Sequence, residues 1–122
     1  MRQDVTLAQL IAVQREFDAM HETGGRSWNQ KIDQDNLSLL MELSVALFGE
    51  LGEFANVVKS IGRGDYTIDD ARTELSNELA DVFIYIVKLV DQLDVDLVSA
   101  FHRKLEVNRE RFKKFERKSA KG

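Results

Sequence analysis

The sequence contains no cysteine and no proline, and it has only 7 glycines and one tryptophan among 122 residues. Without cysteine, a disulfide scaffold, a thiolate zinc site and catalysis by a thiol are excluded. The lack of proline favours long, uninterrupted helices. The longest apolar run, Val82 to Val87, is far shorter than the roughly 20 residues of a membrane-spanning helix, and Asp4, Arg15 and Glu16 break up any signal-peptide core. We therefore expect one small, soluble, cytoplasmic domain over residues 1–122.

The charges are unevenly distributed along the chain. The formal net charge is −4, yet residues 102–122 contain nine lysines and arginines and only three acidic residues. We expect an acidic body followed by a basic, frayed tail from about residue 116. A basic helix can contact nucleic acid, but an acidic body repels a duplex, and only Phe112 and Phe115 interleave the basic residues. We therefore do not expect a nucleic-acid partner.

Apolar residues recur at spacings of three and four along most of the chain, which predicts an all-α fold with four helices. Thr6 and Gln9 form a capping-box pattern before the first helix, whose periodic pattern ends at Gly24 and Gly25. A polar loop then leads to a second helix from about Asp35, which ends within residues 62–65. The apolar face expected for this second helix includes Leu37, Leu40, Leu47, Phe48, Leu51, Phe54 and Val58.

The third and fourth helices also have recognisable N-terminal caps. Thr67 and Asp70 cap the third helix, and either Asp94 or Asp96 caps the fourth. Both helices carry apolar residues at helical spacing, and the fourth ends in a basic segment.

The third helix is apolar nearly all the way round. Between Val82 and Val90, only Tyr85 and Lys88 interrupt the apolar residues. One short chain cannot easily cover such a surface, so Ile84 and Val87 predict a second buried face. A second copy of the chain is the expected cover, and we predict a homo-oligomer, either a dimer or a tetramer.

Two acidic pairs carry the chemistry that the sequence indicates. Glu50 and Glu53 on the second helix, and Glu78 and Asp81 on the third, have the same spacing of three residues and lie at the same phase of their helices. If the two helices pack antiparallel, four carboxylates come together and repel one another unless a cation neutralises them. Oxygen ligands select Mg²⁺, or Mn²⁺ as a substitute, and suggest metal-assisted attack on a phosphate. Two solvated helix faces would give the same pattern, so both interpretations stay open.

These four acids resemble the motif of the MazG-like all-α nucleoside triphosphate pyrophosphohydrolases, E-E-x-x-E followed by E-x-x-D, and in particular the dCTP pyrophosphatase type. The segments ELADVFIYIVKLVDQLDVDL and KLEVNRERF resemble the family's third and fourth helices. The resemblance implies a four-helix bundle of that family's type that cleaves a (deoxy)nucleoside triphosphate between the α and β phosphates, with a role in nucleotide-pool cleaning. It also implies that Glu50, Glu53, Glu78 and Asp81 bind Mg²⁺ and are catalytic.

The resemblance extends to residues that would bind the substrate. Arg26 and Trp28 resemble the Arg-x-Trp of the branch's first loop, which implies that Trp28 stacks on the nucleobase. Tyr85, one helical turn after the last acid, would pack against the deoxyribose. The resemblance also assigns the β and γ phosphates to the K-x3-N-x2-R pattern of Lys104, Asn108 and Arg111.

Two positions depart from the family's pattern. Gly49 stands where the motif has its first glutamate, so this position supplies no general base. Ser60 stands near a position where the dCTP branch carries a tryptophan, and the preferred base therefore stays open. The alternatives are an enzyme for another nucleotide, such as dUTP or phosphoribosyl-ATP, and a non-catalytic helical protein-interaction module.

Overall fold

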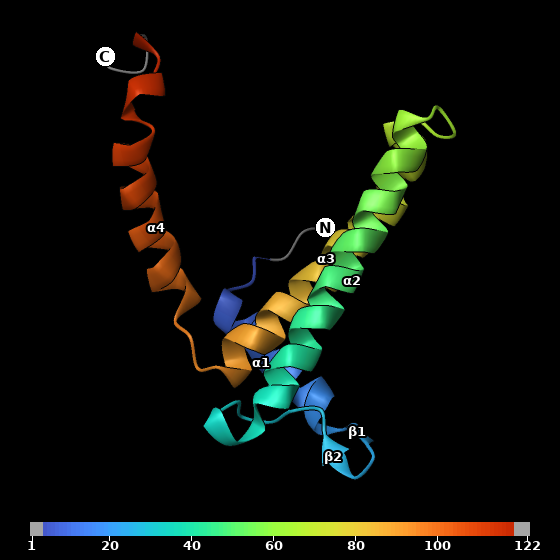
Figure 1. The fold of residues 1–122 in the computed structure, drawn as a ribbon, viewed down its shortest axis with the longest axis vertical. Helices are drawn as coiled ribbons and strands as arrows, with labels where there is room; N and C mark the ends of the chain where they lie inside the picture. The colour runs from blue at the N-terminus through green and yellow to red at the C-terminus, as the bar shows by residue number, and fades with distance from the viewer. Residues whose placement is uncertain (1–3, 119–122) are drawn as a thin grey trace.

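The computed structural model describes residues 4–118, and these residues form an all-α fold, as the sequence predicts (Figure 1). The helices are α1 (Leu7–Ala19), α2 (Leu37–Gly62), α3 (Ile68–Gln92) and α4 (Leu97–Arg111). Shorter elements are the strands β1 (Glu22–Thr23) and β2 (Arg26–Ser27) and the 3₁₀ turns η1 (Gln34–Asn36) and η2 (Lys113–Phe115). Of the expected tail, residues 119–122 lie outside the described residues. None of the described helices is both long enough and apolar enough to cross a membrane.

The helix starts follow the capping patterns of the sequence. Thr6 Oγ1 accepts a hydrogen bond from the backbone N–H of Gln9 at 3.1 Å, and Gln9 Oε1 accepts one from the backbone N–H of Thr6 at 2.7 Å. Thr67 and Asp70 form the same reciprocal pair at the start of α3. Asp96 is the N-cap of α4. These side chains satisfy N–H groups that have no partner within the helix.

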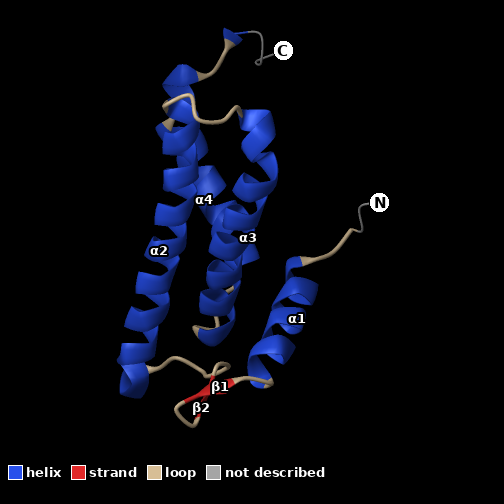
Figure 2. Cartoon of the chain, turned by 90° about the vertical axis from the view of Figure 1, so that its right-hand side faces the viewer, coloured by secondary structure: helices blue, strands red, loops and turns tan. Residues whose placement is uncertain are grey.

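The segment between α1 and α2 is more regular than the polar loop expected from the sequence. Helix α1 ends at Ala19, and β1 and β2 then form an antiparallel hairpin at the foot of the helices (Figure 2). Gly24 and Gly25 form its turn with φ values of 61° and 79°, a left-handed conformation that glycine adopts without strain. The hairpin places Trp28 directly after β2.

Helix α3 is the central helix of the packed part of the molecule. A turn that contains Gly64 joins α2 to α3, and the two helices lie antiparallel. Helix α3 also packs against α1 (Figures 1 and 2). Val87 is therefore only 3% exposed within a single chain, so the prediction that a second copy of the chain covers it is wrong. The central position explains why α3 is apolar nearly all round. Ile84 remains 37% exposed.

Helix α2 buries only part of the face expected for it, because Leu40, Leu47 and Phe54 are half-buried but Leu37, Leu51 and Val58 are exposed. Leu43 and Val57 are buried, whereas Phe48, which was expected on the buried face, is 74% exposed. Met41 and Val45 precede Phe48 at helical spacing and are similarly exposed. The side of α2 away from α3 thus carries an uncovered apolar stripe.

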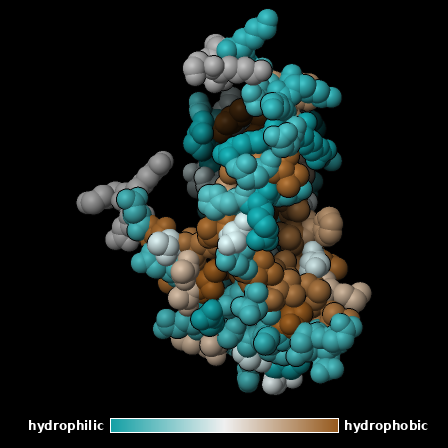
Figure 3. Space-filling view, turned by 90° about the vertical axis from the view of Figure 1, so that its left-hand side faces the viewer, coloured by the Kyte–Doolittle hydropathy of each residue, from teal (hydrophilic) through white to brown (hydrophobic). Residues whose placement is uncertain are grey.

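Helix α4 diverges from the other three helices (Figure 1). The turn before it contains Asp94, whose φ of 57° reverses the chain after α3. Val98, Phe101 and Val107 on α4 are each more than half exposed. Figure 3 shows hydrophobic residues gathered along the middle of the face that is seen from the side of α4. Within one chain, α4 therefore leaves much of its apolar surface uncovered.

Candidate active site

Three carboxylates from the two longest helices come together. Glu50 of α2 meets Glu78 and Asp81 of α3, and one carboxylate oxygen from each lies within 4.8 Å of the others. Glu50 and Glu78 are half-buried and Asp81 is exposed. The antiparallel packing of α2 on α3 produces this group, which we call the carboxylate cluster. A set of ligands consisting of oxygen alone suits a hard divalent cation such as Mg²⁺ or Mn²⁺.

In the carboxylate cluster, the side chain of Glu78 is the one that a bound cation would stabilise most. Burial is the largest cause that raises the pKa of its carboxyl group, and nearby carboxylates, first Asp81 and then Glu53, raise that pKa further. Its Oε2 atom is buried and has no hydrogen-bond partner among the described residues. A cation would give this oxygen a partner and offset the repulsion, so the residues present fit a metal ion.

Glu53 lies near the cluster without belonging to it. Its charge contributes to the raised pKa of Glu78, but its side chain is exposed and its oxygens are not among the three that gather. The structure thus brings together three of the four acids expected from the sequence. A direct bond from Glu53 to a metal stays a prediction.

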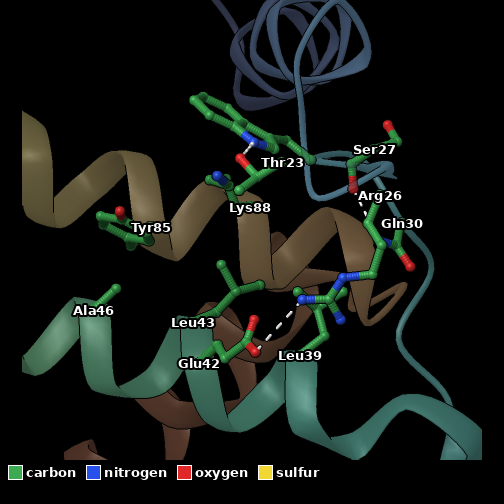
Figure 4. Close-up of a pocket in the computed structure, with 11 residues that line it drawn as sticks. Thr23, Arg26, Ser27, Gln30, Leu39, Glu42, Leu43, Ala46, Tyr85 and Lys88 are labelled. Carbon is green, nitrogen blue, oxygen red and sulfur yellow. Dashed lines mark hydrogen bonds and ion pairs between the residues drawn. The ribbon is translucent and has the colours of Figure 1, made fainter.

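A cavity of about 340 Å³ opens between the hairpin segment, α2 and α3 (Figure 4). Trp28 and Tyr85, which were expected to contact the nucleoside, both line it. On α3, Tyr85 lies one turn after Asp81, and on α2, Ala46 lies one turn before Glu50, so the cavity adjoins the carboxylate cluster. The full lining consists of Thr23, Arg26, Ser27, Trp28, Gln30, Leu39, Glu42, Leu43, Ala46, Tyr85 and Lys88.

The Trp28 side chain is held on several sides. Its Nε1–H donates a hydrogen bond of 2.7 Å to Thr23 Oγ1. The His21 ring stacks on the indole with 4.8 Å between ring centroids and an interplanar angle of 22°. Gln92 Nε2 donates to the backbone carbonyl of Trp28 at 3.3 Å. These contacts fix an aromatic wall of the cavity before any ligand enters it.

Two charged pairs flank the cavity. Arg26 pairs with Glu42 of α2 at 3.7 Å (Figure 4). Lys88 of α3 pairs with Asp18 of α1 at 3.6 Å, and Asp18 is only 2% exposed. The sequence offered a signal for the second pair, because Lys88 interrupts an apolar run and Asp18 lies four residues after Gln14 on the inward side of α1. Sequence reasoning nevertheless missed Asp18, Lys88 and His21.

The three residues expected to hold the phosphate tail lie elsewhere. Lys104 and Arg111 are exposed and Asn108 is half-buried, all on α4. Their spacing places them on one side of the helix. Because α4 diverges from α2 and α3, a single chain does not bring these residues to the carboxylate cluster (Figure 1). Their roles stay predictions.

The chain is similar in sequence to several known proteins over part of their length. No family model matches the chain. The chain is 39% identical over 75 residues to the Gene 37 protein of Mycobacterium phage L5, covering 60% of this chain and 66% of that protein. It is 33% identical over 111 residues to dCTP pyrophosphatase 1 of Homo sapiens and 33% identical over 112 residues to that of Mus musculus. Both matches cover 88% of this chain but span only 59% of the mammalian proteins. These similarities support the resemblance to dCTP pyrophosphatases that the acidic motif indicates.

Proposed function

We propose that the chain is a Mg²⁺-dependent (deoxy)nucleoside triphosphate pyrophosphohydrolase. The observation that carries this proposal is the buried Oε2 of Glu78, which lies inside a cluster of three carboxylates and has no hydrogen-bond partner within residues 4–118. The adjoining aromatic-lined cavity and the similarity to proteins named dCTP pyrophosphatase also support it. In the reaction, water adds to a phosphorus atom, the anhydride bond between the α and β phosphates breaks, and a nucleoside monophosphate and pyrophosphate leave.

The carboxylate cluster is the proposed metal site. Glu50, Glu78 and Asp81 would hold Mg²⁺, and Glu53 completes the set of four. Mn²⁺ can substitute, because it accepts the same oxygen ligands. A bound divalent ion neutralises phosphate charge and activates water. The four side chains are thus the proposed catalytic residues.

The cavity is the proposed nucleoside site. Trp28 would stack its indole on the base, and Tyr85, one turn after Asp81 on α3, would pack against the sugar. Aromatic rings suit this role because every base has a π-face to stack on them. The phosphates would then extend toward Asp81.

The phosphate tail is assigned to α4, and this assignment requires a second copy of the chain. Lys104, Asn108 and Arg111 carry donors suited to the β and γ phosphates, but α4 points away from the cluster of its own chain. The exposed apolar residues Phe48 of α2 and Phe101 of α4 also need cover. We therefore propose a homo-oligomer, a dimer or a tetramer, in which α4 packs against a partner.

The organisation and role follow from the same proposal. Residues 1–122 form one MazG-like domain that cleans the nucleotide pool of the cytoplasm. Other nucleotides, dUTP and phosphoribosyl-ATP among them, are tested as substrates beside dCTP.

A non-catalytic helical interaction module is the second candidate, and the exposed apolar stripe of Met41, Val45 and Phe48 favours it. A thermal melt with Mg²⁺ and a deoxynucleoside triphosphate separates the two functions. A ligand that binds only the native state raises the melting temperature by mass action. The enzyme shows this rise, whereas the module shows none.

Product analysis tests the proposed reaction. The protein is incubated with Mg²⁺ and each of the four common deoxynucleoside triphosphates, and the products are separated. The proposal predicts equal amounts of nucleoside monophosphate and pyrophosphate. Nucleoside diphosphate with orthophosphate, or no turnover of any substrate in the screen, would contradict it.

A further inference from the structure

The ammonium group of Lys88 lies at the aromatic end of the cavity. Its Nζ is 5.6 Å from the centroid of the Trp28 ring and 5.4 Å from that of Tyr85. Figure 4 shows the Lys88 side chain reaching from α3 toward Thr23, with Tyr85 on the same helix. A ligand held between these aromatic side chains therefore meets a positive charge.

Lys88 is held in place by a buried carboxylate. Asp18 Oδ1 lies 3.6 Å from Lys88 Nζ and also accepts a hydrogen bond of 3.0 Å from Gln14 Nε2. The side chains of Asp18 and Lys88 are 3% and 12% exposed. The buried carboxylate of Asp18 thus holds the ammonium group of Lys88 in position.

The ammonium group retains donors for a ligand. Lysine has three N–H donors and no acceptor. Among the described residues, its partners are the carboxylate of Asp18 and two aromatic rings, and 3.6 Å is too long for a hydrogen bond. An acceptor that enters the cavity would satisfy these donors.

The order of residues along α3 indicates which part of a nucleotide meets Lys88. Asp81 belongs to the carboxylate cluster, Tyr85 follows after one turn, and Lys88 lies about 10 Å from Asp81 along the helix axis. A nucleotide with its phosphates at Asp81 and its sugar at Tyr85 places its base at Lys88. The base edge, rather than the phosphates, therefore faces the ammonium group.

We infer that Lys88, positioned by Asp18, makes the cavity select nucleobases that carry a carbonyl oxygen where a competing base carries an amino group. A carbonyl oxygen accepts from the ammonium group. An exocyclic amino group in the same place offers the ammonium group hydrogens and no acceptor, so this direct hydrogen bond is lost. The substrate class is thus the keto bases, which include uracil and hypoxanthine, the deamination products of cytosine and adenine. This inference rests on the proposed function for the placement of the nucleotide.

The acidic group of the cavity does not reverse this preference. Glu42 is an acceptor that an amino group could use, but it comes from α2 and its carboxylate is paired with Arg26 at 3.7 Å (Figure 4). Lys88 comes from α3 and reaches toward the hairpin. Asp18, the other carboxylate beside Lys88, is only 2% exposed and does not line the cavity.

Two pairs of substrates that differ by one keto-to-amino exchange provide the test: dUTP against dCTP, and dITP against dATP. We expect kcat/KM of the wild type to favour the keto member of each pair by about tenfold or more. In the double variant Asp18→Asn/Lys88→Met, which leaves no buried charge, both ratios should approach one. Lys59→Met, at an exposed lysine of α2, is the matched control and keeps the wild-type ratios.

The inference is overturned if the wild type favours the amino member of both pairs, or if the double variant keeps the wild-type ratios. A purely structural role of Lys88 would lower activity on all four substrates and leave the ratios unchanged. Calorimetric binding of dUMP and dCMP to the wild type and the double variant measures the same preference without turnover. Failure of pyrophosphate release from every substrate would contradict the proposed function, while the two affinities would still decide the role of Lys88.

Discussion

The indole of Trp28 stacks on the imidazole of His21 and lies beside the ammonium group of Lys88. His21 stacks on it at 4.8 Å between ring centroids, and Lys88 Nζ lies 5.6 Å from its centroid. Neighbouring side chains thus hold the indole in place before a base enters the cavity that it lines. Preorganisation of this kind reduces the entropy cost of binding.

Replacing Trp28 by alanine should mainly raise KM. Stacking of a base on an aromatic ring contributes on the order of 1 to 3 kcal/mol, and this contribution is present before the chemical step as well as during it. Steady-state kinetics on four deoxynucleoside triphosphates measures the effect. His21→Ala should give a smaller rise, because it loosens the ring without removing it. A Trp28→Ala variant with unchanged KM for every substrate would contradict the nucleoside site.

Substitutions of Asp18 and Lys88 should have strongly non-additive effects on the free energy of unfolding. Lys88→Met alone leaves Asp18 buried without its counter-charge and should cost about 3 to 5 kcal/mol of unfolding free energy. Asp18→Asn combined with Lys88→Met should recover much of this loss, because no buried charge remains. Urea unfolding of the two single variants and the double variant measures the coupling. Additive losses in the double variant would show that the two residues act independently.

Much of the helical framework could be predicted from local sequence. The pairs Thr6 with Gln9 and Thr67 with Asp70 satisfy N–H groups within one turn, so the helix starts depend on neighbouring residues alone. The hairpin was missed because its strands, β1 and β2, have only two residues each and show no period. The positions of the helices could therefore be predicted more accurately from the sequence than the structure of the loop.

Tertiary contacts explain the remaining differences between sequence and structure. Val87 was assigned to a face that a second copy covers, because periodicity does not reveal that α3 packs against both α1 and α2. Asp18 is polar and was not considered as a core residue. Its partner Lys88 lies 70 positions away in the sequence, so local patterns could not indicate the pair. At the candidate site, the motif identified Glu50, Glu78 and Asp81, but spacing alone could not place Glu53 outside their group.

The cap of α4 should make the stability of that helix depend on pH. The backbone N–H of Ser99 donates to Asp96 Oδ1 at 3.0 Å and its hydroxyl donates to Oδ2 at 2.8 Å, and these bonds lower the pKa of Asp96 below the ordinary value of 3.8. A lowered pKa in the folded state stabilises the fold at pH values above 3.8, and this contribution is lost as the pH falls through the folded-state pKa.

Circular dichroism of the wild type and Asp96→Asn from neutral to acidic pH checks this dependence. Asparagine is also a good N-cap but does not titrate in this range. The stability difference between the two proteins should therefore shrink or reverse on acidification. A difference that stays constant down to the acid end of the titration would show that the charge of Asp96 does not matter.

The uncovered apolar surfaces of α2 and α4 should bring chains together. Phe48 and Phe101 are 74% and 59% exposed in a single chain, and burying such residues against a partner is favourable. Light scattering at micromolar concentration should give the mass of a dimer or a tetramer. Replacing both residues by serine should shift the mass toward the monomer. A monomeric wild type would contradict the proposed assembly.

The central claim is that Glu78, in the carboxylate cluster, holds the metal that the reaction requires. The most direct test is the rate of Mg²⁺-dependent pyrophosphate release by Glu78→Gln, with Glu74→Gln, one turn earlier on the same helix, as the matched control. We predict a loss of at least 100-fold for Glu78→Gln, since the variant lacks a ligand charge, and a near wild-type rate for the control. Glu53→Gln should fall between them, with a loss of about 10- to 100-fold, as expected for a residue outside the cluster. A Glu78→Gln variant that releases pyrophosphate as fast as Glu74→Gln, with its helical content intact, would contradict the account.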